Sequence, residues 1–258
     1  MRMVVVAVLV ALVVPSSGPA APATGSAATG SAASGSAATR SSATGSAGPG
    51  RDAGFVALRD VDPGIAEDVR YAGTRNFTGG VVDGYAEPVC LLTRPAARAL
   101  RRAQRDLLRR GYGLKVYDCY RPQRAVDRFV RWAAEPDDPA AKAEFYPDVD
   151  KGRLIPEGYI AERSGHSRGA TVDVTLVWPV GGREVDMGTP FDFFGPPSHT
   201  DSGAVSEAAR ANRRLLRGVL GGAGFVNLRE EWWHFTLRSE PFPDTYFDFP
   251  VSVASVRP

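Results

Sequence analysis

The sequence predicts an α+β domain with a central, mainly antiparallel sheet flanked by helices. After residue 50, segments with helical spacing and segments rich in β-branched and aromatic residues both occur, but they do not alternate regularly as they would around a parallel sheet. The hydrophobic fraction of 43% is sufficient for a core, and the length of 51–258 suits one domain.

Three helices are expected. The first begins near Thr93 and Pro95 and stops at Gly111, with apolar residues at helical spacing between them. The second opens at Pro122 and ends before Pro136, because proline terminates helices. The third is capped by Ser206 and ends at 221–222, a glycine pair.

Strands are expected where β-branched and aromatic residues cluster, which occurs at 114–120, 171–178, 225–226 and 232–237. The stretches 136–163 and 179–205 are rich in proline and glycine, and we expect them to be long ordered loops. Loops of that length are often functional.

The charge of the chain is unevenly placed. There are 31 basic and 29 acidic residues, and Arg2 and Arg40 are the only charged residues of 1–50, so 51–258 is neutral. Proteins that bind nucleic acids gain affinity by neutralising phosphates, so we expect no nucleic-acid partner. The arginine-rich helix at 93–111 is interpreted as a solvated surface.

The first 23 residues are typical of a secretory signal peptide. A basic start at Arg2 precedes an unbroken apolar run from Val4 to Val14, and small residues follow. That run is too short to span a membrane. Residues 24–50 are almost wholly Ala, Gly, Ser and Thr, which indicates a flexible linker. We therefore expect a protein of the cell-wall space or medium, with no stable membrane insertion after signal cleavage.

The sequence has two cysteines, Cys90 and Cys119. An even number in an exported chain indicates a disulfide, with two unrelated buried thiols as the alternative. A zinc-binding cysteine pair is less favoured, because no C-x-x-C spacing is present.

Two histidine motifs indicate a metal site. His166 precedes Asp173 in a segment that contains Gly169, and Glu231 precedes His234. Two imidazoles and one carboxylate suit Zn²⁺ and leave a fourth position for water, whose proton a further carboxylate must take. The bend at Gly169 would let His166 meet Asp173, and Glu231 needs a local turn to approach His234. Taken singly, each motif is a weak signal, because a histidine in a loop can be a hydrogen-bonded surface residue rather than a metal ligand. His199 has no such motif and is interpreted as a loop histidine.

Several segments together carry a family resemblance. The S-x-H-x-x-G-x-x-x-D motif of 164–173 and the E-x-x-H motif of 231–234 are accompanied by N-F-T-G at 76–79, V-D-G-Y at 82–85, Y-R-P-Q-R-A-V at 120–126, M-G-T-P-F-D-F at 187–193 and Y-F-D-F-P at 246–250. Through nearly all of 55–250, the chain resembles VanX-type D-alanyl-D-alanine dipeptidases, within the zinc D-Ala-D-Ala peptidase superfamily that also includes the Hedgehog signalling domain.

The resemblance implies roles for individual residues. It makes His166, Asp173 and His234 the ligands of one Zn²⁺ per chain, and Glu231 the general base and acid. Arg121 would stabilise the oxyanion, a role that suits a fixed cation; the alternative is a structural ion pair at a helix start.

The resemblance also implies substrate contacts. Asp192 and Tyr71 would hold the substrate ammonium group, and Ser164 and Tyr85 would contact the backbone or carboxylate end. The alternatives are a loop cap for Asp192, packing for the tyrosines and a turn for Ser164.

The expected activity is hydrolysis of the small dipeptide D-Ala-D-Ala by a domain that spans 51–258. A D,D-carboxypeptidase or endopeptidase that trims peptidoglycan stem peptides is the alternative, and a non-catalytic cell-wall-binding module is less favoured. The export signal, the linker and the cysteines depart from the family and affect the biological role rather than the catalytic residues. The oligomeric state stays open.

Overall fold

A five-stranded sheet organises residues 49–257, the part of the chain that the computed structural model describes. Its strand order is β2-β4-β5-β7-β6, formed by Ala66–Glu67, Gly113–Asp118, Thr171–Val177, His234–Leu237 and Phe225–Asn227. Strand β2 pairs with β4 in parallel, and every other neighbour in this sheet pairs antiparallel. A second pair, β1 (Phe55–Ala57) and β3 (Leu91–Thr93), is antiparallel. The predicted α+β class with a mainly antiparallel sheet is confirmed.

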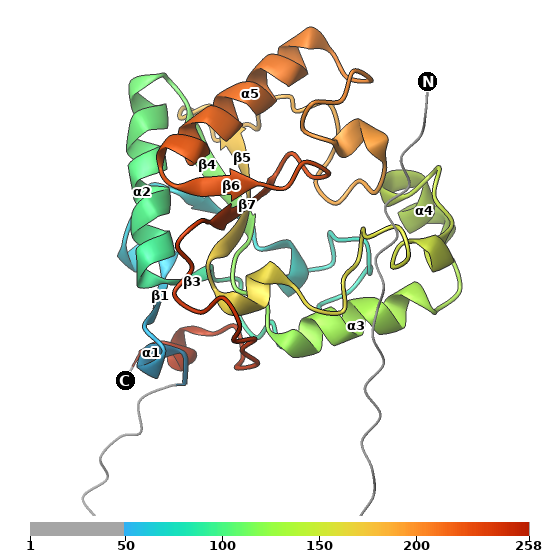
Figure 1. Ribbon diagram of the computed structural model, residues 1–258, viewed down its shortest axis with the longest axis horizontal. Coiled ribbons are helices and arrows are strands. Elements are labelled where there is room, and N and C mark those ends of the chain that lie inside the picture. Colours follow the sequence, from blue (N-terminus) through green and yellow to red (C-terminus); the bar gives the residue numbers. More distant parts are fainter. Residues whose placement is uncertain (1–48, 258) are drawn as a thin grey trace, which may run out of the picture. The chain divides into compact units, whose positions relative to one another are not determined.

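Helices surround this sheet (Figure 1). They are α1 (Pro49–Asp52), α2 (Arg94–Arg109), α3 (Gln123–Ala133), α4 (Pro139–Phe145) and α5 (Glu207–Gly222). Helices α2 and α5 pack against each other, α2 against β4, and α5 against β5 and β6. The Ser206 side chain caps α5 by accepting a hydrogen bond from the backbone N–H of Ala209, as the sequence predicts. None of the described helices is long and apolar enough to cross a membrane.

The sequence prediction is wrong in two places. The stretch 136–163 is not loop throughout, because Asp138 caps α4 by accepting from the Ala140 N–H and Pro139 opens the helix. The last strand begins at His234 rather than Trp232, and the two tryptophans are buried in the turn before it. The predicted signal segment 1–23 and nearly all of the linker 24–50 lie outside the described residues.

Strand β5 is buried along its entire length. Its Val172, Val174 and Leu176 join the hydrophobic core, whereas Asp173 alternates with them. Successive side chains of a strand point to opposite faces, so Asp173 lies on the face away from those apolar residues. The fold thus places one carboxylate in the centre of the sheet, where burial makes an unpaired charge costly.

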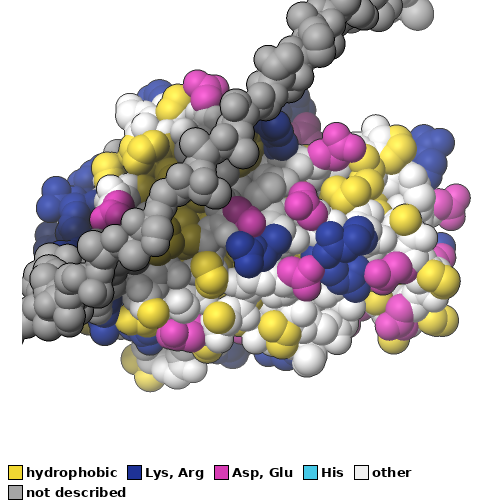
Figure 2. Space-filling model, turned by 90° about the horizontal axis from the view of Figure 1, so that it is seen from below, with side chains coloured by type: hydrophobic (Ala, Val, Ile, Leu, Met, Phe, Trp, Pro, Cys, Tyr) yellow, Lys and Arg dark blue, Asp and Glu magenta, His cyan; other side chains and the backbone are white. Residues whose placement is uncertain are grey.

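Basic and acidic side chains are mixed on the surface. Arg124 pairs with Asp248 at 2.9 Å, and Arg131 pairs with Asp83 at 2.7 Å. Figure 2 shows basic and acidic side chains side by side over much of the visible part of one face. Exposed pairs of this kind contribute about 0–1 kcal/mol each, so the stability of the domain rests mainly on its core.

Gly169 ends the turn that carries His166, and we expect Gly169→Ala to destabilise the protein by about 2–4 kcal/mol. Its φ of 75° is unfavourable for a side chain, and a Cβ there would lie 2.2 Å from the ring of Phe55. Urea denaturation measures the change in unfolding free energy. Gly203→Ala is the control, because that position is exposed and a Cβ added to it would meet no atom within 4 Å. Equal stability of the two variants would contradict the prediction.

Candidate active site

Strand pairing brings the central polar residues together. Asp118 of β4 lies opposite Asp173 of β5, which lies opposite His234 of β7. Neighbouring strands are about 4.8 Å apart, so this register places three polar side chains in a row across the sheet. Asp118 was missed in the sequence analysis. Its position at the end of a predicted strand, three residues before Arg121, is the signal that could have identified it.

His166 reaches this row from the 3-10 turn Gly165–Arg168. The Ser164 hydroxyl oxygen accepts a hydrogen bond from the His166 backbone N–H at 3.2 Å. The ring Nδ1 of His166 lies 2.7 Å from the carbonyl oxygen of Cys119, so Nδ1 carries the hydrogen and donates it. That bond leaves Nε2 as the free acceptor, which is the arrangement found in metal-ligating histidines.

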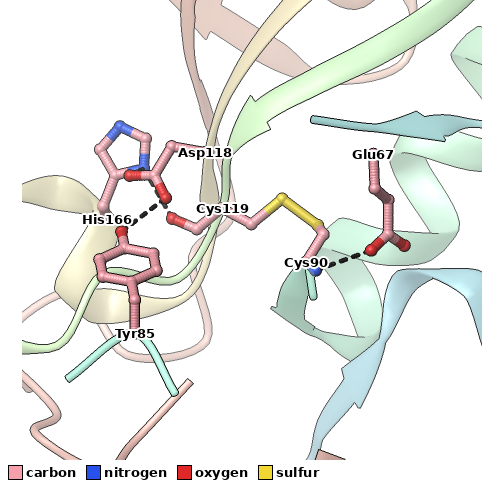
Figure 3. The surroundings of a disulfide bond; sticks show 6 residues. All are labelled: Glu67, Tyr85, Cys90, Asp118, Cys119 and His166. Carbon is pink, nitrogen blue, oxygen red and sulfur yellow. Dashed lines mark hydrogen bonds and ion pairs between the residues drawn. A yellow bond between two sulfur atoms is a disulfide. The ribbon is translucent and has the colours of Figure 1, made fainter. Parts of the chain in front are cut away.

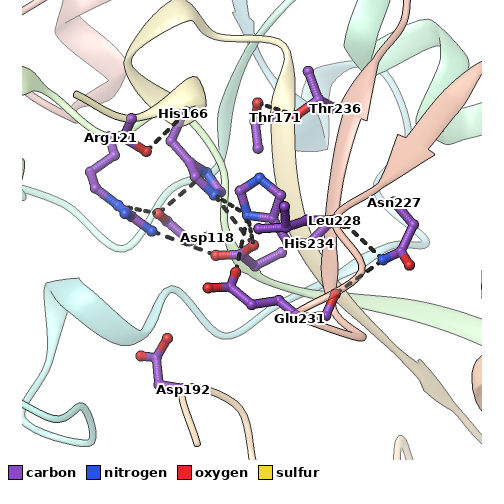
Figure 4. Close-up of polar contacts among 12 residues, drawn as sticks. Asp118, Arg121, His166, Thr171, Asp192, Asn227, Leu228, Glu231, His234 and Thr236 are labelled. Carbon is purple, nitrogen blue, oxygen red and sulfur yellow. Dashed lines mark hydrogen bonds and ion pairs between the residues drawn. The ribbon is translucent and has the colours of Figure 1, made fainter. Parts of the chain in front are cut away.

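Three atoms converge where a metal ion would bind. The distances are 3.2 Å from His166 Nε2 to Asp173 Oδ1, 3.1 Å from His234 Nδ1 to the same oxygen, and 3.3 Å between the two nitrogens. A tetrahedral zinc ion with bonds of about 2.0–2.1 Å would separate its ligands by about 3.3 Å. Asp173 Oδ1 is also buried without a hydrogen-bond donor. The three residues therefore fit a divalent metal such as zinc. Figure 4 shows the rings of His166 and His234 close together, with the Glu231 carboxylate nearby.

His166 Nε2, Asp173 Oδ1 and His234 Nδ1 form a triangle, called here the metal-ligand triangle. Glu231 lies beside it, with Oε2 3.4 Å from His234 Nδ1. The predicted local turn is present: the His234 N–H donates to the Glu231 carbonyl at 3.3 Å. Asn227 stabilises the turn, because its side-chain amide donates to the carbonyl oxygens of both Glu231 and His234 at 3.0 Å. Asn227 is a further residue that the sequence analysis did not identify.

The electrostatics of the site follow from burial and close charges. Burial, joined by the negative charge of Asp173, raises the pKa of Glu231 to about 7, although His234 opposes the shift. Burial lowers the pKa of His234, but the negatively charged Asp173, 3.1 Å away, outweighs burial and raises that pKa overall. Glu231 is thereby suited to exchange protons near neutral pH.

Arg121 follows the end of β4 and is fixed by carboxylates. Its Nε donates to Asp118 Oδ2 at 2.9 Å, and its Nη2 lies 3.6 Å from Asp173 Oδ2. The guanidinium also lies over the ring of Tyr71, 5.0 Å from its centre. Asp118 and Asp173 are buried, so the single charge of Arg121 offsets part of theirs and lies beside the metal-ligand triangle.

A cavity of about 190 Å³ opens onto these groups. Its lining includes Arg121, Asp173, Glu231 and His234 together with Asp192 and Tyr71. The Tyr71 hydroxyl donates to Asp192 at 2.9 Å, and no basic side chain of the described residues lies within ion-pair distance of this carboxylate. Burial and the nearby charge of Asp173 raise the pKa of Asp192 well above its usual range. Asp192 is a buried carboxylate without a cationic partner.

Ser164, Tyr85 and His199 differ in whether they face the active-site cavity. Ser164 lines the cavity, whereas Tyr85 does not. The Tyr85 hydroxyl donates to Asp118 Oδ1 at 2.6 Å, which places Tyr85 behind the carboxylate that holds Arg121. His199 lies apart from the metal-ligand cluster and lines a separate surface hollow.

A disulfide joins Cys90 to Cys119, with the two Cα atoms 5.3 Å apart. Figure 3 shows its proximity to the site, since the carbonyl of Cys119 is the group that accepts from His166. On the other side, the Cys90 N–H donates to Glu67 Oε2 at 3.0 Å. The disulfide thus links the residue that precedes strand β3 to the segment that orients a metal ligand.

Replacing both cysteines with alanine is expected to lower the unfolding free energy by about 3–4 kcal/mol, because the disulfide closes a loop with a sequence separation of 29. Urea denaturation with and without a reducing agent measures this change. The reductant should destabilise the parent protein and leave the double variant unaffected. A parent protein that is indifferent to the reductant, although its disulfide is reduced, would contradict the prediction.

Two histidines and an aspartate that can hold a divalent metal, with a glutamate beside them, are typical of a metallopeptidase. A family model described as D-ala-D-ala dipeptidase, Peptidase_M15, matches residues 51–252. The chain belongs to this peptidase family.

Curated relatives support that membership. A D-alanyl-D-alanine dipeptidase of Enterococcus faecalis is 45% identical over 199 residues, which cover 77% of this chain and 98% of the relative. One of Streptomyces coelicolor is 46% identical over 198 residues, with the same coverage of 77% and 98%. One of Enterococcus faecium is 42% identical over 200 residues, which cover 78% and 99%.

Proposed function

We propose that this protein is a zinc-dependent dipeptidase that hydrolyses D-Ala-D-Ala to two molecules of D-Ala. The observation that carries the proposal is the cavity lined by Asp173 and His234 of the metal-ligand set, by Glu231 and by the unpaired carboxylate of Asp192. Family membership and the names of the relatives support the same activity.

The metal would be held by His166, Asp173 and His234. Zinc bound there supplies a Lewis acid that acidifies water enough for attack on a peptide near neutral pH. Glu231 takes a proton from the attacking water and delivers it to the nitrogen of the leaving amine. Burial raises the pKa of Glu231 above that of an exposed glutamate, which favours acceptance of the proton.

Arg121 stabilises the negative charge that develops on the carbonyl oxygen of the scissile peptide. The carboxylate of Asp118 holds its guanidinium in place before the substrate arrives, so little reorganisation is required during the reaction. Tyr85 supports this arrangement by donating to the other oxygen of Asp118. Tyr85 therefore acts through Asp118 in this proposal rather than by direct contact with the substrate.

Asp192 binds the free ammonium group of the substrate. A buried carboxylate is stabilised by a cation that enters beside it, and the Tyr71 hydroxyl orients its oxygens. This anchor favours free dipeptides over N-blocked stem peptides, because an acylated nitrogen carries no charge to pair with Asp192. The carboxypeptidase alternative lacks an equivalent use for this buried charge.

The proposed location is outside the cytoplasm, on the basis of the signal-like start of the sequence. There the enzyme would act on free dipeptide in the cell-wall space or the medium. Cell fractionation should recover the activity outside the cytoplasm and a mature chain that lacks about the first 23 residues. Full-length protein retained in the cytoplasm would contradict this location.

Metal removal tests the zinc requirement. Dialysis against a chelator should abolish release of D-Ala from D-Ala-D-Ala, and one equivalent of Zn²⁺ per chain should restore it. Metal analysis of Asp173→Asn should show weakened zinc binding, because a neutral amide replaces the only carboxylate of the ligand set. Full activity in protein shown to be free of metal would contradict the proposal.

We expect Asn227→Ala to lower kcat by about 10- to 100-fold, because the turn that places Glu231 beside His234 loses both hydrogen bonds from the Asn227 amide. Steady-state kinetics on zinc-loaded protein measure the change. Asn212→Ala is the control, since its amide donates to the Asp186 carbonyl at an exposed site outside the active-site cavity. Parent-like kcat in Asn227→Ala would contradict the role of the turn.

A further inference from the structure

Asp192 can bind only the ammonium end of a dipeptide substrate. A dipeptide carries a free carboxylate as well as an ammonium group. The cavity lining contains three carboxylates, those of Asp173, Asp192 and Glu231. A substrate carboxylate that enters among them requires a cationic partner, because like charges at close range repel strongly where water is scarce.

Two arginines line the cavity, Arg121 and Arg163. Arg121 is already paired with Asp118 and lies close to Asp173, and its side chain is only 12% exposed. Its charge is therefore largely balanced within the protein, and its proposed role is at the scissile carbonyl. This leaves Arg163 as the arginine of the lining that is free to meet a second negative group.

Arg163 differs from its neighbours in its partners. Its guanidinium lies over the ring of Tyr246, 5.0 Å from the ring centre, and the residue is exposed. The nearby Arg168, in contrast, forms a two-pronged pair with Glu240 at 2.7 and 2.8 Å. Among residues 49–257, no carboxylate pairs with Arg163 in the way that Glu240 pairs with Arg168. Stacking on Tyr246 orients the guanidinium and leaves its N–H groups available.

The position of Arg163 in the chain places it beside other residues of the active site. It immediately precedes Ser164, which lines the cavity, and it lies three residues before His166. The Ser164 hydroxyl oxygen accepts from the His166 N–H, so its own hydrogen remains available to a ligand. Arg163 and Ser164 line the same cavity as Asp192 and Glu231. Anchors for both ends of a dipeptide would thus face the cavity that holds the residue proposed to transfer the proton.

We infer that Arg163 binds the C-terminal carboxylate of the substrate, with Ser164 as a second donor, and selects dipeptides with a free C-terminus. This inference rests on the proposed dipeptidase function. A guanidinium offers two parallel N–H donors to a carboxylate, a geometry that a neutral amide terminus does not match. Substrates whose C-terminus is amidated or extended lose this pairing.

The test compares D-Ala-D-Ala with its C-terminal amide. For the parent protein, kcat/KM should be about 10- to 50-fold higher for the acid than for the amide, as expected for a charge-assisted hydrogen-bonded pair. Arg163→Gln should raise KM for the acid by a similar factor, leave kcat within about threefold, and leave the amide unaffected. Arg163→Lys should retain part of the preference, because the charge remains and the paired geometry is lost.

Arg98→Gln is the matched control, since Arg98 is exposed on α2 and lies outside the cavity. It should behave like the parent with both substrates. If the parent cleaves D-Ala-D-Ala and Arg163→Gln keeps the parental preference for the acid, the role of Arg163 is overturned and the proposed function stands. Equal losses on acid and amide would also overturn it. A zinc-loaded parent that cleaves neither substrate would overturn the proposed function and this inference with it.

Discussion

Glu231→Gln is expected to lower kcat for D-Ala-D-Ala by about 10²–10⁴-fold while the protein stays folded and binds zinc. The amide keeps the shape of the side chain but accepts no proton from water, and general acid–base catalysis typically contributes about 10²–10⁴-fold. The close contact of Glu231 with His234 makes it the nearest carboxylate outside the proposed ligand set. Stopped or continuous assays of D-Ala release measure the effect.

Glu230→Gln is the matched control, because Glu230 is the adjacent exposed glutamate and does not line the cavity. Its kcat should stay within about twofold of the parent value, as for an exposed charge that is screened by solvent. Near-parental activity in Glu231→Gln would rule out Glu231 as the base and require another group to transfer the proton.

Arg121→Lys is expected to lower kcat and kcat/KM together by about 10²–10³-fold. Lysine preserves the positive charge beside Asp118 but not the fork of N–H donors that reaches both the carboxylate and the developing oxyanion. Loss of an interaction that forms only in the transition state lowers both constants equally. An increase in KM at unchanged kcat would instead assign Arg121 to ground-state binding.

The stability of the Arg121 variants should be measured alongside their kinetics. Arg121 neutralises Asp118, which has no exposed surface, so Arg121→Ala would leave a buried charge unpaired and destabilise the fold. Comparison of Arg121→Lys with the parent in urea separates the loss of catalysis from the loss of folding. A catalytic role requires the kinetic defect to persist in protein that is fully folded.

The long, periodic elements of the fold could be predicted from the sequence. Helices α2, α3 and α5 carry clear start and stop residues, and β5 is rich in β-branched residues. The short strands β1, β2 and β3 were missed because two or three residues carry too little periodicity to distinguish a strand from a loop. Helix α4 has a cap and a proline at its start, but it lies within a stretch dominated by turn-forming residues.

Part of the candidate active site could also be predicted from the sequence. His166, Asp173, Glu231 and His234 were identified from scarce histidines and a family resemblance, and the structure brings their side chains together. Asp118 and Asn227 were not identified, because their roles arise from strand register and a turn rather than from a motif. Tyr85 illustrates the same limit: its position behind Asp118 depends on tertiary packing.

A comparison of two substrates shows whether the enzyme requires a free ammonium group at the position of Asp192. Zinc-loaded protein is assayed for release of D-Ala from D-Ala-D-Ala and from an N-acylated Lys-D-Ala-D-Ala peptide, with Asp192→Asn in parallel. We expect the parent to cleave the free dipeptide and to leave the blocked peptide essentially intact. Asp192→Asn should lose most of its activity on the dipeptide, because the ammonium anchor is gone. Cleavage of only the blocked peptide by the parent protein would contradict this expectation.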